Sequence, residues 1–163
     1  MADAGDPYDL NRFVEAQECR YKECQKRCYE QALSEVETGL KVHHWIWYIF
    51  PQFEGLGHSW NSEHYSIKSV SEAEAYLQHP VLGPRLTKCA EAALGVEGRS
   101  HDIFGSDDMK LRSCAILFAL VSPAGSVFHK LLDKYFQGEP DYKTLSLLTI
   151  ALNQWSRTAF PDS

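Results

Sequence analysis

The sequence predicts an all-α fold: a compact domain of about six or seven helices, with an aromatic segment at its centre. Three observations lead to this prediction. Apolar residues recur at helical spacing along most of the chain. Ser, Asp and Gly stand where these stretches begin and end, as helix caps do. Strand patterns are weak, because only Tyr65-Ser66-Ile67 and the aromatic run 45–50 are candidates for extended backbone.

The chain has the size of one domain. Its 163 residues, of which 44% are hydrophobic and 23% charged, can bury a substantial core but leave little material for a second one. We therefore expect a single helical domain over residues 1–163, with an ordered core over residues 6–155 and flexible termini.

Composition also bounds the partners and the compartment. A net charge of −6 argues against nonspecific nucleic-acid binding, which needs clustered Lys and Arg. No apolar run approaches the roughly 20 residues of a membrane span, and the acidic segment 1–9 lacks the pattern of a signal peptide. Five scattered cysteines fit a reducing compartment. The sequence thus predicts a soluble, cytoplasmic protein.

In the first third of the chain, Asp6 or Asp9 is expected to cap a helix that continues or restarts through residue 38 and stops at Gly39. The charged stretch from Cys19 to Cys28 lies between its two apolar stripes. Cys24 and Cys28 have the spacing of a zinc-binding pair, but no matching second pair follows downstream. We interpret this stretch as solvated helix surface, and we expect neither a metal nor a cofactor.

Helices are also expected through the rest of the chain. Ser71-Glu72-Ala73-Glu74 is interpreted as a capping box, and residues 102–105 as a turn before a cap at Ser106-Asp107-Asp108. That cap opens a helix that is apolar on every side and is therefore expected at the centre of the fold. The expected helices run in order from the capping box to His79-Pro80, from Leu82 to Gly95 or Gly98, from Asp108 to Val121, from Val127 to Gly138, and from Asp141 through Leu152.

Residues 43–60 hold three of the four tryptophans and three of the seven histidines. Aromatic side chains offer flat faces, and Trp N–H and His nitrogens make directed hydrogen bonds, so we interpret the segment as the wall of a cleft for a planar ligand. The alternative is that the run Trp45–Phe50 is simply core. The sequence leaves both open.

Two blocks carry a resemblance to a known family. They are Asp6-Pro7-Tyr8-Asp9-Leu10 and His44-Trp45-x-Trp47-Tyr48-Ile49-Phe50-Pro51-Gln52, the latter followed by Gly55-Leu56-Gly57. Together with shorter matches as far as Leu148, they resemble the family catalogued as domain of unknown function 1810. The resemblance implies a mainly helical domain without an assigned activity. Some members are labelled calpastatin, a disordered and repetitive inhibitor that this apolar, non-repeating sequence does not match. The stretch Cys19–Cys28 departs from the family as an insertion.

The block Trp60-Asn61-Ser62-Glu63-His64-Tyr65 is similar to the Glu-His-Tyr element of the helical NADAR family, which is associated with ADP-ribose chemistry. This likeness implies a nucleotide-like ligand and, as an enzyme hypothesis, an N-glycosidase. Such chemistry needs a carboxylate near the anomeric carbon, an aromatic platform and a cation. The candidate catalytic residues are Glu63, Glu54 and His44; the candidate ligand-binding residues are Lys41, Trp45, Trp47, Gln52, Ser59, Trp60, Arg85 and Lys110.

Each candidate also has a plain structural role open to it. Glu63 and Glu54 fit solvated loop carboxylates, His44 can orient a turn, and Lys110 can pair with Asp107 one turn earlier. The competing hypothesis is therefore a non-catalytic binding or protein-interaction module with a structural aromatic segment. Convergence of the candidates on one concavity would favour a ligand site.

Overall fold

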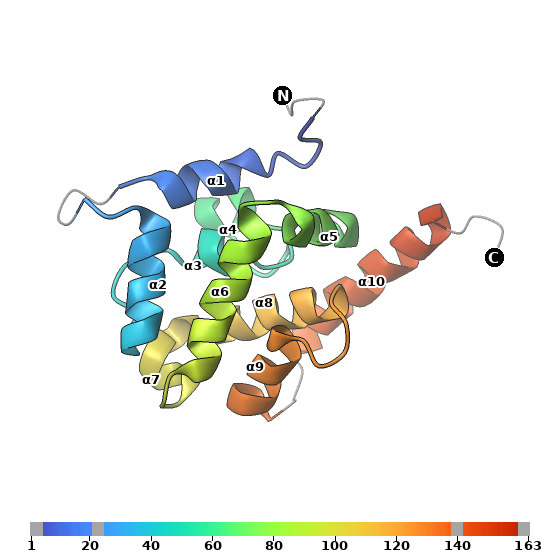
Figure 1. Ribbon diagram of the computed structural model, residues 1–163. Coiled ribbons are helices and arrows are strands. Elements are labelled where there is room, and N and C mark those ends of the chain that lie inside the picture. Colours follow the sequence, from blue (N-terminus) through green and yellow to red (C-terminus); the bar gives the residue numbers. More distant parts are fainter. Residues whose placement is uncertain (1–4, 21–24, 138–141, 160–163) are drawn as a thin grey trace.

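The computed structural model describes residues 5–20, 25–137 and 142–159, with side chains as far as Ile150 in the last range (Figure 1). Seven helices of eight residues or more lie in this part of the chain: α1 (Asn11–Glu18), α2 (Cys28–Thr38), α5 (Val70–Gln78), α6 (Leu82–Gly95), α8 (Asp108–Leu120), α9 (Val127–Phe136) and α10 (Tyr142–Ala159). The shorter elements are α3 (Ile46–Ile49), α4 (Trp60–His64), α7 (Ser100–Phe104) and the 3₁₀ turn η1 (Gly105–Asp107). The described chain is all-α, as predicted.

Helices α6 and α8 organise the packing. Helix α6 contacts α2, α5 and α9, while α8 contacts α9, α5 and α10. In Figure 1, α1 lies across one end of α6, and the later turns of α10 project beyond the rest of the body. The segment that carries α3 and α4 lies behind α6 in this view, between α1 and α8.

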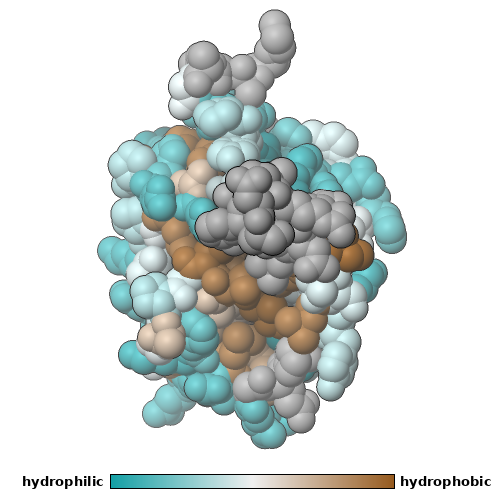
Figure 2. All heavy atoms as spheres, turned by 90° about the vertical axis from the view of Figure 1, so that its right-hand side faces the viewer, coloured by the Kyte–Doolittle hydropathy of each residue, from teal (hydrophilic) through white to brown (hydrophobic). Residues whose placement is uncertain are grey.

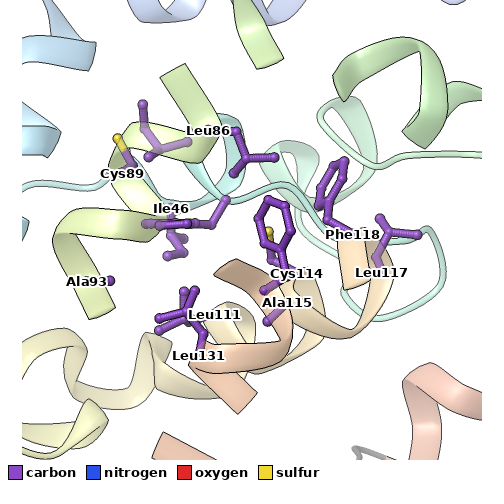
Figure 3. Packing of buried hydrophobic residues seen from close by; sticks show 14 of the residues in the cluster. Ile46, Leu86, Cys89, Ala93, Leu111, Cys114, Ala115, Leu117, Phe118 and Leu131 are labelled. Carbon is purple, nitrogen blue, oxygen red and sulfur yellow. The ribbon is translucent and has the colours of Figure 1, made fainter. Parts of the chain in front are cut away.

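The core forms around α8, which is apolar on every side as its sequence predicts. Leu111, Leu117 and Phe118 are fully buried. Figure 3 shows how side chains of α8 meet Leu86, Cys89 and Ala93 of α6 and Leu131 of α9. Apolar burial of this extent is the main term that stabilises such a fold. Figure 2 shows that a band of hydrophobic surface nevertheless remains on the face that lies to the right in Figure 1.

Several predicted helix boundaries are confirmed. The Asp6 carboxylate accepts from the backbone N–H groups of Leu10 and Asn11 at 2.8 and 2.9 Å, so it caps α1. The helix restarts at Cys28, and Gly39 ends it in the left-handed conformation at φ 84°.

Other boundary predictions were wrong. Ser69, not Ser71, caps α5, and its hydroxyl accepts from the N–H of Glu72 at 3.0 Å. Residues 100–104 form α7 where a turn was expected. Asp107 makes no side-chain cap bond to α8, because its carboxylate is bound to two lysines instead.

The two candidate extended segments have different outcomes. The aromatic run is not extended, since residues 46–49 form the single turn α3. Ile67 does pair with the segment that follows the aromatic run. Its N–H donates to the Gln52 carbonyl at 2.8 Å, and its carbonyl accepts from the N–H of Glu54 at 2.9 Å. This isolated parallel bridge joins segment 52–54 to segment 65–67.

A buried guanidinium ties α1 to this region. All five N–H groups of Arg12 donate at 2.7–2.9 Å, to the carbonyls of Tyr8, Asp9, His64 and Ser66 and to the carboxylate of Glu72. Arg12 and Glu72 are both buried, so each charge is compensated by its partner and by hydrogen bonds. The result is a fixed path for the backbone on both sides of Tyr65.

A buried carboxylate shapes the start of the aromatic segment. Glu35 of α2 is only 5% exposed. Its oxygens accept from Gln31 Nε2, from the backbone N–H groups of Val42 and His43, and from Trp45 Nε1, at 2.6–3.0 Å, and they contact His43 Nδ1 at 2.6 Å. Burial by itself would raise the pKa of Glu35, but the hydrogen bonds outweigh it and lower the pKa to about 2. The turn at 42–45 is thus fixed by an ionised side chain.

No helix in the described ranges combines the length and apolar character that a bilayer crossing requires. The four cysteines with described positions, Cys19, Cys28, Cys89 and Cys114, are free thiols. The interpretation of the stretch Cys19–Cys28 as solvated helix surface was wrong for its described part, because residues 19–20 and 25–27 are not helical, and Arg20 and Arg27 form an antiparallel bridge. Cys24 lies outside the described residues. Cys19 is exposed and Cys28 is buried.

We predict that Gly83→Ala destabilises the protein by about 3 kcal/mol. A Cβ at this position would lie 2.1 Å from the carbonyl oxygen of Leu77, so the junction of α5 and α6 would have to move. Gly95→Ala is the matched control in the same helix, since nothing lies within 4 Å of a Cβ there; it should be neutral or stabilising by up to about 1 kcal/mol. Urea unfolding of both variants measures the difference, and equal stabilities would contradict the close approach.

We also predict that Glu35→Gln lowers stability at pH 7 and removes a pH dependence. The folded-state pKa of Glu35 is about 2, below its usual 4.5. Its contribution is therefore fully present above pH 4.5 and is lost as the pH falls toward 2, by roughly 2 to 3 kcal/mol. Unfolding free energies across this window should fall more steeply for the parent protein than for the variant. Glu97→Gln, which removes an exposed carboxylate, is the control; parallel curves for the parent and Glu35→Gln would refute the assignment.

Candidate functional site

A cleft of about 230 Å³ lies between α3, the segment 52–57, Tyr65, α8 and the start of α10. Its polar lining comes from Trp47, Gln52, Ser62, Tyr65, Lys110, Ser113 and Lys143. Phe53, Leu56 and Met109 supply apolar surface. These residues are distant in sequence, so the cleft is a product of the tertiary fold.

The buried charges described above position two walls of the cleft. Trp47 lies in α3, just after the turn that Glu35 fixes. Tyr65 lies between His64 and Ser66, whose carbonyls are both bound by Arg12. The Gln52 carbonyl is held by the N–H of Ile67. The cleft is therefore formed by backbone that has little freedom to relax.

Trp47 has an uncompensated donor. Its side chain is half-buried, but the indole Nε1 is sealed from solvent and has no hydrogen-bond partner. It is the one side-chain nitrogen or oxygen in this condition within the described residues. A buried N–H without an acceptor costs roughly 1 to 3 kcal/mol, so proteins rarely retain one without a reason.

Lys110 is held by a shared carboxylate. Asp107 bonds Lys110 Nζ through Oδ1 at 3.0 Å and Lys41 Nζ through Oδ2 at 2.9 Å. The Lys41 side chain is 7% exposed, whereas that of Lys110 is 33% exposed and lines the cleft. Burial would raise the pKa of Asp107, but the two lysine contacts prevail and lower it.

The cleft is positively charged although the chain is acidic. Lys110 and Lys143 line it, and no Asp or Glu does so among the residues that the structure describes. The donors Trp47 Nε1 and the Gln52 amide lie with these cations. Such a lining matches a ligand with acceptor oxygens and negative charge.

A second hollow of about 510 Å³ adjoins the cleft, and the two share Phe53 and Gly57. Glu54, His58, Glu63 and Lys68 line it, with Leu147 and Ile150 of α10. Both carboxylates are exposed. The structure thus brings the candidate acids Glu54 and Glu63 together, but in the hollow beside the cleft rather than inside it.

The structure places Trp45 and Lys41 in the interior. Trp45 is 0% exposed, and its Nε1 donates to Glu35 at 3.0 Å. Lys41 Nζ lies 5.0 Å from the centre of the Trp45 ring and donates to the His43 carbonyl at 2.7 Å as well as to Asp107. Trp45 is thus core, and Lys41 is the inner partner of Asp107.

The remaining candidates lie outside both hollows. His44 is exposed. Ser59 caps α4 by accepting from the N–H of Ser62 at 3.1 Å. Trp60 is 68% exposed and stacks on His64 at 4.4 Å between ring centres. Arg85 bonds Glu18 and Gln17 and lies over the ring of Tyr29. Only Trp47, Gln52 and Lys110 of the candidates line the cleft.

Sequence reasoning missed four polar residues of the cleft, Ser62, Tyr65, Ser113 and Lys143. Tyr65 stands within the block compared with NADAR proteins, which could have drawn attention to it. Ser113 and Lys143 have no local signal, because each is an ordinary residue of a helix whose direction only the tertiary packing reveals. No group of three or more His, Cys, Asp or Glu side chains is placed to hold a metal ion within the described ranges.

Comparisons with known proteins give one similar solved structure and one matching family. A conserved hypothetical protein from Mycobacterium tuberculosis, known from a crystal structure, is 44% identical to this chain and superposes with a TM-score of 0.80, covering 88% of this chain and 99% of its own. None of the curated proteins compared matches the sequence. The likeness to the NADAR family finds no support in these comparisons. A family described as "Protein of unknown function (DUF1810)" matches residues 7–148, which include every polar residue named in the cleft, and the chain belongs to that family.

Proposed function

We propose that this protein binds a nucleotide-like small molecule with a negative charge in the cleft between α3 and α8. One observation carries the proposal: Trp47, Gln52, Tyr65 and Lys110 come from separate segments and line one hollow that has cations but no described carboxylate. Aromatic surface suits a planar base, and lysine suits a phosphate.

Size is consistent with such a ligand. Small-molecule sites usually measure about 300 to 1,000 Å³. The cleft alone, at about 230 Å³, is smaller than this range, but it adjoins the hollow of about 510 Å³. A nucleotide held in the cleft would have room to extend past Gly57 into this second hollow.

Turnover of an ADP-ribose-type ligand by an N-glycosidase is the second candidate function. The observation that favours it is that the cleft and the second hollow share Phe53 and Gly57. A ligand that extended from the cleft into this hollow would lie next to Glu54 and Glu63. One carboxylate would stabilise positive charge at the anomeric carbon or activate water. Without turnover, the same cleft serves a non-catalytic binding module. The free thiols of the described cysteines suit a reducing compartment, and we keep the cytoplasm as the proposed location.

Binding should be visible as thermal stabilisation. A ligand present at 100 times its dissociation constant stabilises the folded state by about 2.7 kcal/mol. We expect ADP-ribose, NAD or AMP to raise the melting temperature of the parent protein, and Lys110→Met to abolish the shift by removing a cation from the cleft. Lys130→Met removes an exposed lysine of α9 and should leave the shift intact. Equal shifts in both variants would place the ligand elsewhere, and no shift with any nucleotide would refute the proposal.

The enzyme hypothesis makes a separate prediction. Glu63→Gln should reduce release of base or nicotinamide from the bound nucleotide by at least about 100-fold, because it removes a general acid or base. The melting-temperature shift with the same ligand should persist, since Glu63 lies outside the cleft. Glu74→Gln, on a half-buried side chain of α5, is the control. Chromatography of the products gives the rate; binding without any product in the parent protein would leave the non-catalytic module.

A further inference from the structure

We propose that the cleft contains an oxyanion subsite in which a phosphate oxygen of the ligand takes the indole N–H of Trp47 and displaces Asp107 from Lys110. The subsite rests on the proposed function and specifies how the charged part of the ligand is held. It assigns the nucleotide phosphate, rather than the base, to the α8 side of the cleft.

The first step of the argument is the indole of Trp47. Its Nε1 has no partner and is sealed from solvent, yet the side chain lines the cleft. The nearby Trp45 shows what the fold does with a structural indole, because its Nε1 donates to the Glu35 carboxylate at 3.0 Å. Trp47 has no such acceptor from the protein. A ligand oxygen that reached it would relieve the unpaired donor, and the hydrogen bond would be strengthened by the charge on the oxygen.

Access to the indole depends on neighbouring side chains. Met109 and Lys110 are consecutive residues of α8 that also line the cleft, and Met109 is exposed. A long, unbranched side chain such as Met changes rotamer at low cost. The proposal requires a side chain of the cleft to move when the ligand enters, and Met109 and Lys110 are suited to this while the backbone, fixed by Arg12 and Glu35, stays in place.

The second step is the carboxylate of Asp107. It uses separate oxygens for Lys110 and Lys41, at 3.0 and 2.9 Å. If Lys110 turns to a ligand phosphate, Asp107 keeps its ion pair with the buried Lys41. When Lys110 exchanges Asp107 for the phosphate, neither Asp107 nor Lys41 is therefore left without an ion pair. Asp107 acts as an internal anion that occupies Lys110 until a ligand anion replaces it.

The indole N–H can be observed directly by ¹⁵N–¹H NMR. The chain has four tryptophans, so there are four indole signals to assign through Trp→Phe variants. We expect addition of inorganic pyrophosphate or ADP-ribose to move the Trp47 signal downfield, as a new hydrogen bond does. The Trp45 and Trp60 signals should stay in place. Adenosine, which has no phosphate, should leave the Trp47 signal unchanged.

The carboxylate exchange has a sharper test. Asp107→Asn should raise the affinity for pyrophosphate about two- to fivefold, because it weakens the competing ion pair. Lys110→Met should lower that affinity at least tenfold. Asp102→Asn removes another carboxylate that pairs with a basic residue three positions away, outside the cleft, and should change nothing. Should Asp107→Asn fail to fold, the NMR titration of the parent protein still decides.

The outcomes separate the subsite from the proposed function. If a nucleotide binds in a way that depends on Lys110 but does not move the Trp47 signal, the subsite is overturned and the cleft remains the proposed binding site. If adenosine moves the Trp47 signal as far as ADP-ribose does, the indole contacts the base rather than a phosphate, and the subsite is overturned. If pyrophosphate moves the Trp47 signal but no nucleotide binds, the subsite stands and the proposal of a nucleotide ligand is refuted. No effect from any of these probes would refute both.

Discussion

The buried guanidinium of Arg12 is the interaction on which the rest of the structure depends. It joins four backbone carbonyls and one carboxylate from three parts of the chain: the start of α1, the segment 64–66 and α5. A buried charge is tolerated only when its donors are satisfied, and here all five are. Loss of any one segment would leave unpaired polar groups in the interior. The N-terminal helix, the wall of the cleft and the helix that follows therefore form one cooperative unit.

Glu35 fixes the backbone on the other wall of the cleft, at the turn before α3. Its ionised carboxylate determines the turn that leads into α3, and so decides which of two neighbouring tryptophans becomes core and which meets the cleft. Trp45 is tied inward by the carboxylate, while Trp47, half a helical turn later, faces a different environment. The aromatic segment is accordingly both core and cleft wall: Trp45, Ile46, Ile49 and Phe50 are buried, whereas Trp47 lines the cleft.

The longer helices could be predicted because each carries an apolar stripe or, in α8, is apolar on every side, although the caps of α5 and α8 were assigned wrongly. The candidate site could be predicted only in part. Arg12, Glu35 and Glu72 look like solvated residues in the sequence, although each stands beside apolar residues of its own stripe: Phe13, Val36 and Ala73 are all buried. A charge on the apolar face of a helix is the signal that could have revealed them. Trp47 and Lys110 were identified from residue type, but their meeting depends on how α3 and α8 pack. Arg85 had suitable chemistry but bonds Glu18 and Gln17, and His44 is exposed outside both hollows.

Helix α10 contributes to the site from a distance. Its first turns supply Lys143 to the cleft and Leu147 to the adjoining hollow, while its later turns project past the body (Figure 1). An α-helix is stiff along its axis, because every backbone hydrogen bond resists bending. A tilt imposed on the outer turns would therefore be transmitted to Lys143 and Leu147 as a rigid lever transmits a push. A displacement of the projecting turns of α10 would therefore change the width of the site even where those turns do not contact the ligand.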